Sequence, residues 1–256
     1  MFRTSTLRSV LPRIKLSSGG LYRSYHSQDH LGSNNIINKN SVESRVFTKA
    51  LEFIPEKGFT KECIYKAVRE LQYSDSLLSI FSNSTVGISL EFQLVLFWLK
   101  YQRQRLLTYV ESNPSFFEIS GEENRVTHLI QKRLEFNEPV IGKLSGAISQ
   151  LIIPYHVDKS LEELHNLSDD VAFYSNDQSN DFSWYSKRFG LSTIYASSEV
   201  YMLQDNSPKF RSTHSFVEEK VSNMYQLGEA YNSFEEWTLF NAMSTVNLIK
   251  SQWHRG

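Results

Sequence analysis

Residues 169–208 read DDVAFYSNDQSNDFSWYSKRFGLSTIYASSEVYMLQDNSP, an acidic start followed by a segment rich in aromatic residues. Asp177, Ser179 and Asp181 precede a run that suits a helix. Asp and Ser are favoured at such positions because their oxygens accept hydrogen bonds from unpaired N–H groups of the first helical turn. Farther on, Ser207 and Pro208 form the pattern of a cap followed by a first-turn proline. The stretch therefore predicts two successive helices.

One side of the first of these helices combines a cation with aromatic rings. Residues three and four positions apart lie on the same side of a helix. That side carries Trp184, Arg188, Leu191 and Tyr195. A guanidinium on an apolar face suggests a site where a charged group meets an apolar one, such as a lipid headgroup. These four residues are the predicted lipid-binding residues, and an ion pair from Arg188 to Asp177 or Asp181 is the alternative.

The chain after residue 40 has the sequence character of helices almost throughout. It has no Asn-Gly or Asp-Gly hairpin signal and no sustained alternation of polar and apolar residues, so a sheet is not expected. The predicted fold class is all-α. The expected helices are 41–54, 60–72, 75–82, 86–111, 122–150 with a bend at Pro139, 158–175, 182–205, 208–228 and 233–252. The apolar 86–111 helix should be central and buried, with Lys100, Arg103 and Arg105 turning toward solvent.

Composition narrows the classes of function. The 256 residues carry a net charge of -1, so the chain as a whole has no positive field that would attract nucleic acid. No run approaches the roughly 18 apolar residues expected of a membrane-spanning helix. A single cysteine, Cys63, rules out an intramolecular disulfide. The 13 Tyr and 17 Phe residues suit broad aromatic packing or a lipophilic cavity.

The N-terminal segment predicts a targeting function. It contains basic, Ser and Thr residues and no acidic residue before Asp29. That composition is typical of a mitochondrial transit peptide, which we place at residues 1–26, and it lacks the continuous apolar core of a secretory signal. A disordered basic tail is the alternative. Residues 27–40 are rich in Ser and Asn and are interpreted as a flexible linker.

The quoted stretch closely resembles the mitochondrial ubiquinone-biosynthesis accessory proteins, the lipid-binding family of coenzyme Q biosynthesis protein nine. The matching elements are Asp169-Asp170, Tyr174, Asp177-Gln178-Ser179, Asp181-Phe182, Trp184-Tyr185, Lys187-Arg188, Ile194-Tyr195, Met202-Leu203-Gln204-Asp205 and Ser207-Pro208. The resemblance extends more weakly from about Ser44 to the C-terminus. It implies a lipid-binding accessory protein, and the expectation that the protein is not an enzyme comes from the absence of catalytic motifs described below.

The resemblance also implies a surface that binds a partner protein. In the family, the patch built around Asp181, Trp184 and Tyr185 contacts the diiron hydroxylase that acts late in ubiquinone synthesis, and Asp170 lies in the same region. An exposed Trp-Tyr pair would be a suitable interface anchor. If the two rings are buried, they are core residues instead. From the residues alone, Asp169 and Asp170 are interpreted as a solvated helix face.

Residues 41–84 are similar to the helix-turn-helix of TetR-type transcriptional regulators, and residues 85–229 would then form the helical lipid-binding and dimerisation domain. A reading helix needs donors for base edges and cations for phosphates. The candidate reading helix, Asp75 to Ser82, has no Lys or Arg. We therefore expect a TetR-like fold without nucleic-acid binding, and a homodimer. A TetR-type ligand-responsive DNA-binding regulator is the alternative function.

The C-terminal segment, residues 230–256, predicts an amphipathic helix. Apolar residues recur there at helical spacing: Leu239, Ala242, Met243, Val246, Ile249 and Trp253. With cations at its end, such a helix suits a bilayer interface. The family resemblance also implies a membrane-associating helix at this position. A docked helix or a dimer contact is the alternative.

Catalytic motifs are absent from the sequence. It has no Gly-rich phosphate loop, no Gly-x-Ser-x-Gly elbow and no paired-Cys or His-rich metal motif. Glu162 and His165 have the spacing of one ferritin-type ligand pair, but such sites need two pairs and two further Glu residues. An exposed helix face is therefore the interpretation of this pair, and neither a metal nor a cofactor is expected. An enzyme acting on quinone ring substituents remains a further alternative.

Together these features predict a carrier. An apolar cavity within the helical domain would take isoprenoid quinone precursors, and the terminal helix would contact phospholipid on the matrix side of the inner mitochondrial membrane. The chain would then present the lipid to the diiron hydroxylase of ubiquinone synthesis and its biosynthetic complex. Each buried CH₂ contributes roughly 0.8 kcal/mol, so several isoprene units could offset the cost of leaving the bilayer.

Overall fold

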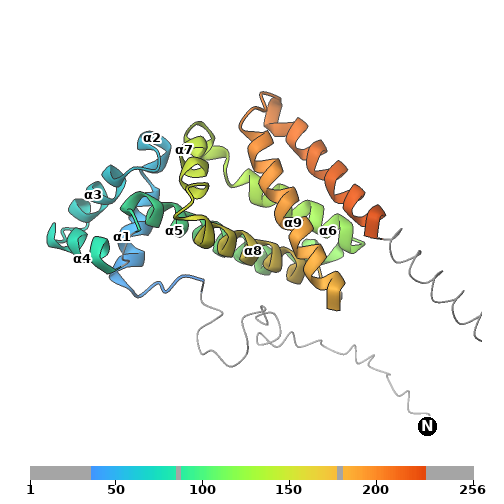
Figure 1. The fold of residues 1–256 in the computed structure, drawn as a ribbon, viewed down its shortest axis with the longest axis horizontal. Helices are drawn as coiled ribbons and strands as arrows, with labels where there is room; N and C mark the ends of the chain where they lie inside the picture. Colours follow the sequence, from blue (N-terminus) through green and yellow to red (C-terminus); the bar gives the residue numbers. More distant parts are fainter. Residues whose placement is uncertain (1–35, 85–87, 178–180, 229–256) are drawn as a thin grey trace, which may run out of the picture. The chain divides into compact units, whose positions relative to one another are not determined.

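The computed structural model describes residues 36–84, 88–177 and 181–228, and every regular element in these ranges is a helix (Figure 1). The α-helices are α1 (Val42–Leu51), α2 (Ile54–Lys57), α3 (Lys61–Glu70), α4 (Ser76–Ser84), α5 (Leu90–Ser112), α6 (Glu122–Glu135), α7 (Ile141–Leu151), α8 (Val157–Tyr174), α9 (Asp181–Met202) and a further helix over residues 211–228. Short 3-10 helices cover Pro114–Glu118, Glu138–Val140 and Pro208–Phe210. The all-α prediction is confirmed, and the TetR-like arrangement stays a prediction. The predicted transit peptide and the 233–252 helix lie outside the described residues.

Serine side chains cap the starts of two helices. Ser41 precedes α1, and its hydroxyl accepts a hydrogen bond from the backbone N–H of Ser44 at 3.0 Å. Ser89 precedes α5 and accepts in the same way from Phe92 at 3.2 Å. Each cap satisfies one of the N–H groups that the first helical turn leaves unpaired.

Prolines divide two of the predicted helices. The helix expected over 41–54 ends at Leu51 and resumes as α2, with Pro55 in its first turn. The helix expected over 122–150 is interrupted by the 3-10 turn that contains Pro139, so a break replaces the expected bend. Proline lacks an N–H donor and fixes its φ angle, and it is therefore accommodated where a helix begins.

The long helix α5 lies at the centre of the packing, as predicted. It contacts α1, α3, α6, α7 and α8. Its apolar residues enter a core that the N-terminal helices share: Phe97 stacks on Phe47 at 5.3 Å between ring centroids, and Trp98 meets the edge of Phe59 at 5.2 Å. Offset and edge-on ring pairs of this kind stabilise a core beyond the area that they bury.

The C-terminal half of the structure is built on α9. This helix packs along α8, and the 211–228 helix lies against it on another side (Figure 1). The rings of Tyr201 and Phe216 stack at 4.7 Å between centroids. At Gly190, an added Cβ would come within 2.7 Å of the Met224 Sδ atom, so glycine allows the close approach of the two helices. Among the described residues, no helix is both long and apolar enough to cross a membrane.

Asp205 fixes the turn between α9 and the next helix. Its carboxylate accepts from the backbone N–H of Ser207 at 2.8 Å and from the N–H and hydroxyl of Thr213 at 2.8 and 2.7 Å. Burial acts to raise the pKa of Asp205, but these hydrogen bonds outweigh it and lower the pKa to about 2. The ionised form is therefore the one that the fold stabilises.

Replacing Asp205 with Asn should lower the free energy of unfolding at pH 7 by about 1–2 kcal/mol, because charge-assisted hydrogen bonds are lost. The folded-state pKa lies below the unfolded value, so this contribution is fully present above about pH 4 and is lost as the pH falls toward about 2. Urea unfolding at several pH values measures it. Exposed Glu118→Gln is the control, and an equal effect of both substitutions at pH 7 would contradict the role of Asp205.

Candidate functional site

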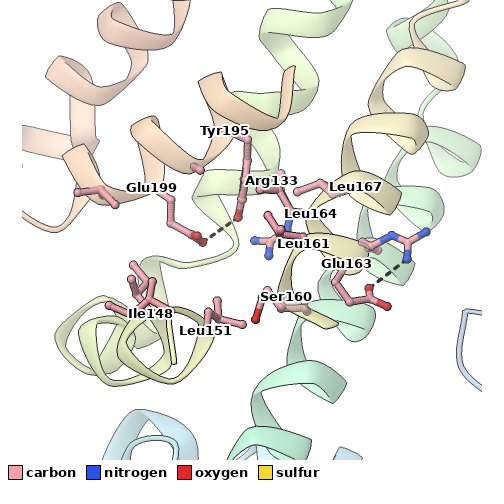
Figure 2. A pocket seen from close by; sticks show the side chains of 15 residues that line it. Arg133, Ile148, Leu151, Ser160, Leu161, Glu163, Leu164, Leu167, Tyr195 and Glu199 are labelled. Atoms are coloured by element: carbon pink, nitrogen blue, oxygen red, sulfur yellow. Dashed lines mark hydrogen bonds and ion pairs between the residues drawn. The ribbon is translucent and has the colours of Figure 1, made fainter. Parts of the chain in front are cut away.

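An apolar cavity of about 230 Å³ lies among α5, α6, α7, α8 and α9 (Figure 2). Most of its wall is aliphatic, and each of the five helices contributes a side chain. The main apolar lining residues are Leu99, Ile148, Leu151, Leu164, Leu167 and Val200. A cavity of about 150 Å³ lined by such side chains is large enough to hold benzene and stays dry when empty. The cavity can therefore hold a substituted ring with a short aliphatic extension.

The cavity opens to the surface beside exposed apolar side chains. Ile152, Leu161 and Val200 belong to the lining, and they are 70%, 58% and 48% exposed. Tyr155, close to Ile152 in the chain, is also exposed. Contiguous exposed apolar side chains are typical of ligand entrances and of surfaces that meet a membrane or a protein.

The inner wall carries a buried cation, Arg133 of α6. Its Nη1 donates to the Asn137 Oδ1 at 2.7 Å, and its guanidinium carbon lies 5.3 Å from the ring centroids of both Trp98 and Tyr195. The side chain is 1% exposed, yet within the described part of the chain it forms no salt bridge, and its Nε–H has no hydrogen-bond partner. Such a donor is unusual because leaving it unpaired in the interior costs free energy.

A carboxylate, Glu199 of α9, faces the same end of the cavity. Its Oε1 accepts from the Tyr195 hydroxyl and from the Asn137 Nδ2, both at 2.8 Å. Figure 2 shows Tyr195 and Glu199 reaching from one helix toward the Arg133 side chain. Burial raises the pKa of Tyr195 well above its usual value, so its hydroxyl remains a donor. Asn137 thus connects the cation of Arg133 to the carboxylate of Glu199.

A second buried cation, Arg103 of α5, is fully paired. Its Nε donates to the Asp170 Oδ2 at 2.7 Å and its Nη1 to the Glu163 Oε2 at 3.2 Å. Arg103 and Glu163 line the cavity, whereas Asp170 lies behind them. Burial raises the pKa of Asp170 despite the attraction of Arg103. The expectation that Arg103 turns toward solvent is wrong, because two carboxylates on α8 hold it inside.

A third buried cation, Arg188 of α9, is also held by carboxylates. Its Nε donates to the Asp169 Oδ1 at 2.6 Å and its Nη1 to the Asp177 Oδ2 at 2.9 Å, while its guanidinium lies 3.9 Å from the Trp184 ring centroid. Arg188 is buried and does not line the cavity. The lipid-headgroup prediction for Arg188 is therefore corrected: the structure shows the ion pair with Asp177, joined by one with Asp169.

The chain is similar in sequence to proteins of one family. A model of the COQ9 family matches residues 157–228, which contain α8, α9 and the helix after them. The mitochondrial ubiquinone biosynthesis protein COQ9 of Saccharomyces cerevisiae is 36% identical over 92% of this chain and 95% of its own length. The chain belongs to the COQ9 family. The protein of the same name from Schizosaccharomyces pombe is 31% identical over 90% of this chain and 87% of its own length. The Homo sapiens COQ9 protein is 31% identical over 73% of this chain and 58% of its own length.

In this COQ9 family member, the four predicted lipid-binding residues occupy different environments. Tyr195 lines the cavity and takes part in its polar end. Leu191 is buried one turn away and is not part of the lining. Trp184 lies half-buried against Arg188, away from the cavity. The cavity residues Arg133 and Glu199 were not identified from the sequence, although the four-residue spacing of Tyr195 and Glu199 was a usable signal.

The residues predicted to bind a partner are also separated. Tyr185 is 62% exposed, and its ring meets Trp184 edge-on at 4.7 Å between centroids. Phe189, one turn farther along α9, is exposed as well. Asp170 is buried against Arg103, as Asp169 is against Arg188, so the expectation of a solvated helix face is wrong for both aspartates. The carboxylate of Asp170 is therefore not available on the partner surface. The side chain of Asp181 lies outside the described part of the structure.

The described residues show no metal centre. No group of three or more His, Cys, Asp or Glu side chains is placed to hold an ion in the ranges that the structure describes. Glu162 forms an exposed ion pair with Lys159 at 2.9 Å, as expected for a residue on a helix face. The membrane residues predicted at Leu239, Met243, Val246, Ile249 and Trp253 lie beyond the described helices.

Proposed function

We propose that this chain is a non-catalytic accessory protein of mitochondrial ubiquinone biosynthesis that binds isoprenoid quinone precursors. The observation that carries the proposal is the open apolar cavity among α5–α9, within a chain of the COQ9 family. The cavity volume suits the ring and the first part of an isoprenoid chain. The remaining chain would leave between Ile152, Leu161 and Val200, whose exposed apolar side chains would cover it.

The carrier would work at the matrix side of the inner membrane as a peripheral protein, and as a homodimer. It would withdraw the precursor from phospholipid and present it to the diiron hydroxylase of ubiquinone synthesis. Purified hydroxylase, supplied with precursor in liposomes, tests this function directly. We expect the full-length chain to raise the hydroxylation rate several-fold, and a variant with a filled cavity to have no effect. Equal acceleration by both proteins would contradict the carrier role.

The exposed ring of Tyr185 supports a role as the partner anchor. Truncating an interface anchor typically weakens binding by 2 kcal/mol or more, which is about a thirtyfold loss. We expect Tyr185→Ala to weaken binding to the hydroxylase by about that factor in a biolayer or calorimetric titration, without changing the thermal midpoint. Tyr155→Ala, which removes another exposed tyrosine, is the matched control. Similar losses for both variants would exclude a specific anchor.

The C-terminal residues 230–256 would hold the protein at the bilayer. Their apolar stripe and terminal cations are suited to anionic membrane surfaces. We expect a chain ending at residue 232 to bind liposomes containing cardiolipin at least about tenfold more weakly than the full chain in a sedimentation assay. Neutral liposomes provide the control. Unchanged binding of the shortened chain would remove the membrane step.

A further inference from the structure

We propose that Arg133, Asn137, Tyr195 and Glu199 form a headgroup subsite that selects an uncharged ring bearing oxygen substituents over an anionic headgroup. The inference rests on the proposed function, since it concerns the ligand of the same cavity. It specifies which end of the ligand enters the cavity first and which chemical groups that end carries.

The unpaired donor of Arg133 is the first observation. Its guanidinium is on the cavity wall and 1% exposed, it makes one hydrogen bond, to Asn137, and its Nε–H is unsatisfied among the described residues. Figure 2 shows the side chain among the lining residues, and its guanidinium carbon lies 5.3 Å from the Tyr195 ring centroid. A buried guanidinium that is short of acceptors favours a ligand that brings an oxygen to this end of the cavity.

The charges around the cavity are the second observation. The lining contains two cations, Arg103 and Arg133, and two carboxylates, Glu163 and Glu199, while a third carboxylate, Asp170, is bonded to Arg103. Lys100 offsets this third carboxylate, since its Nζ lies 3.9 Å from the Glu163 Oε1, and the formal charges of the group sum to zero. Arg103 is already shared by Glu163 and Asp170. A phosphate or carboxylate headgroup would therefore gain only Arg133, and its charge would be repelled by the neighbouring carboxylate of Glu199 in an apolar interior.

An uncharged oxygen avoids this repulsion. A ring carbonyl or methoxy oxygen accepts from Arg133, and a ring hydroxyl can donate to Glu199, whose Oε1 already receives the Tyr195 and Asn137 donors. The Asn137 bridge holds the cation and the carboxylate in fixed positions, so both functions are present before a ligand arrives. The aliphatic wall at Leu164 and Val200 then accepts the apolar part of the ligand.

Three probes with the same decyl chain separate headgroup chemistry from hydrophobic binding: a decyl-substituted dimethoxybenzoquinone, decylbenzene and decyl phosphate. Their affinities for the full chain are measured by isothermal titration calorimetry, with decyl phosphate below its critical micelle concentration and the two uncharged probes below their solubility limits. We expect the quinone to bind at least about tenfold more tightly than either of the other two, because a hydrogen bond to a charged donor contributes that much. Binding of decyl phosphate as tight as that of the quinone would overturn the inference, and this comparison needs no variant.

A substitution then assigns the effect to Arg133. Arg133→Met removes the guanidinium and keeps an unbranched apolar side chain that reaches to about the position of Nε. We expect it to weaken quinone binding by about tenfold and to leave decylbenzene within about twofold. Equal losses for both probes would show that Arg133 only shapes the wall. If the quinone binds the wild type and Arg133→Met equally, the subsite is wrong and the carrier function stands. If no probe binds the wild type, the proposed function itself fails.

Discussion

Arg103→Met should lower the free energy of unfolding by about 3–5 kcal/mol, the largest stability effect that we expect from a single substitution in this chain. The substitution leaves the buried carboxylates of Asp170 and Glu163 without the cation that they share. A buried charge is costly unless an opposite charge lies beside it. Removing only the arginine therefore destabilises the fold by more than the whole ion pair stabilises it. Chemical denaturation at pH 7 measures the loss.

A second substitution distinguishes the loss of the ion pair from a simple packing defect. Arg103→Met with Asp170→Leu replaces most of the ionic group by apolar side chains, and we expect it to recover at least about half of the loss. Glu162→Ala, which breaks the exposed pair with Lys159 on the same helix, is the surface control and should cost less than about 1 kcal/mol. A double variant as unstable as the single one would contradict an electrostatic cause.

The same substitution should respond to pH. Burial raises the pKa of Asp170, and the loss of Arg103 would raise it further. When a folded-state pKa lies above the unfolded value, the folded state binds the proton more tightly, and stability increases as the pH falls through that pKa. The penalty of Arg103→Met should therefore be smaller at pH 5 than at pH 7. A penalty that is constant over this range would indicate that Asp170 is not the group left uncompensated.

Ala196→Trp should abolish lipid binding by occupying the cavity. Ala196 is a lining residue on α9, next to Tyr195. An indole at this position takes the volume that a ring would use, and excluding even five carbon atoms of a ligand forfeits about 4 kcal/mol. We expect the affinity for a short-chain isoprenoid quinone to fall by at least about a hundredfold.

The neighbouring residue provides a matched control for this substitution. Ser197 is exposed and is not part of the cavity lining. Ser197→Trp adds the same side chain one position along the same helix and should leave the affinity within about twofold, since it points away from the cavity. Calorimetric titration compares the two variants, and circular dichroism verifies that both are folded. Equal losses would mean that the ligand does not occupy this cavity.

Local patterns in the sequence were sufficient to predict most of the helices. The continuous apolar residues of 86–111 predicted a central helix because burial on all sides requires that composition, and α5 has this position. At Pro139 the sequence predicted a bend, and the structure has a break between two helices instead. The same reasoning did not predict the break before Pro55: α1 ends at Leu51, and α2 begins at Ile54 with Pro55 in its first turn.

The polar interior could not be predicted in this way, because its partners are far apart in the chain. Arg103 meets Asp170 across 67 positions, and Asn137 meets Glu199 across 62. Helical spacing places residues on a face but does not say which element covers that face. Arg188 was therefore predicted to bind a lipid headgroup because of its aromatic neighbours. In the structure its guanidinium donates hydrogen bonds to the carboxylates of Asp169 and Asp177. Tyr195, predicted from the same helix face, does line the cavity, and its role in lipid binding stays a prediction.

Ligands that remain bound through purification report most directly on whether the space among α5–α9 holds an isoprenoid quinone. The mature protein, isolated from mitochondria in mild detergent, can be examined by native mass spectrometry, and its lipids can be extracted and identified. We expect a polyisoprenoid ring compound at close to one per chain in the wild type and in Ser197→Trp, and its loss in Ala196→Trp. Recovery of phospholipid alone, or of the same isoprenoid compound from all three proteins, would show that this cavity is not a quinone site.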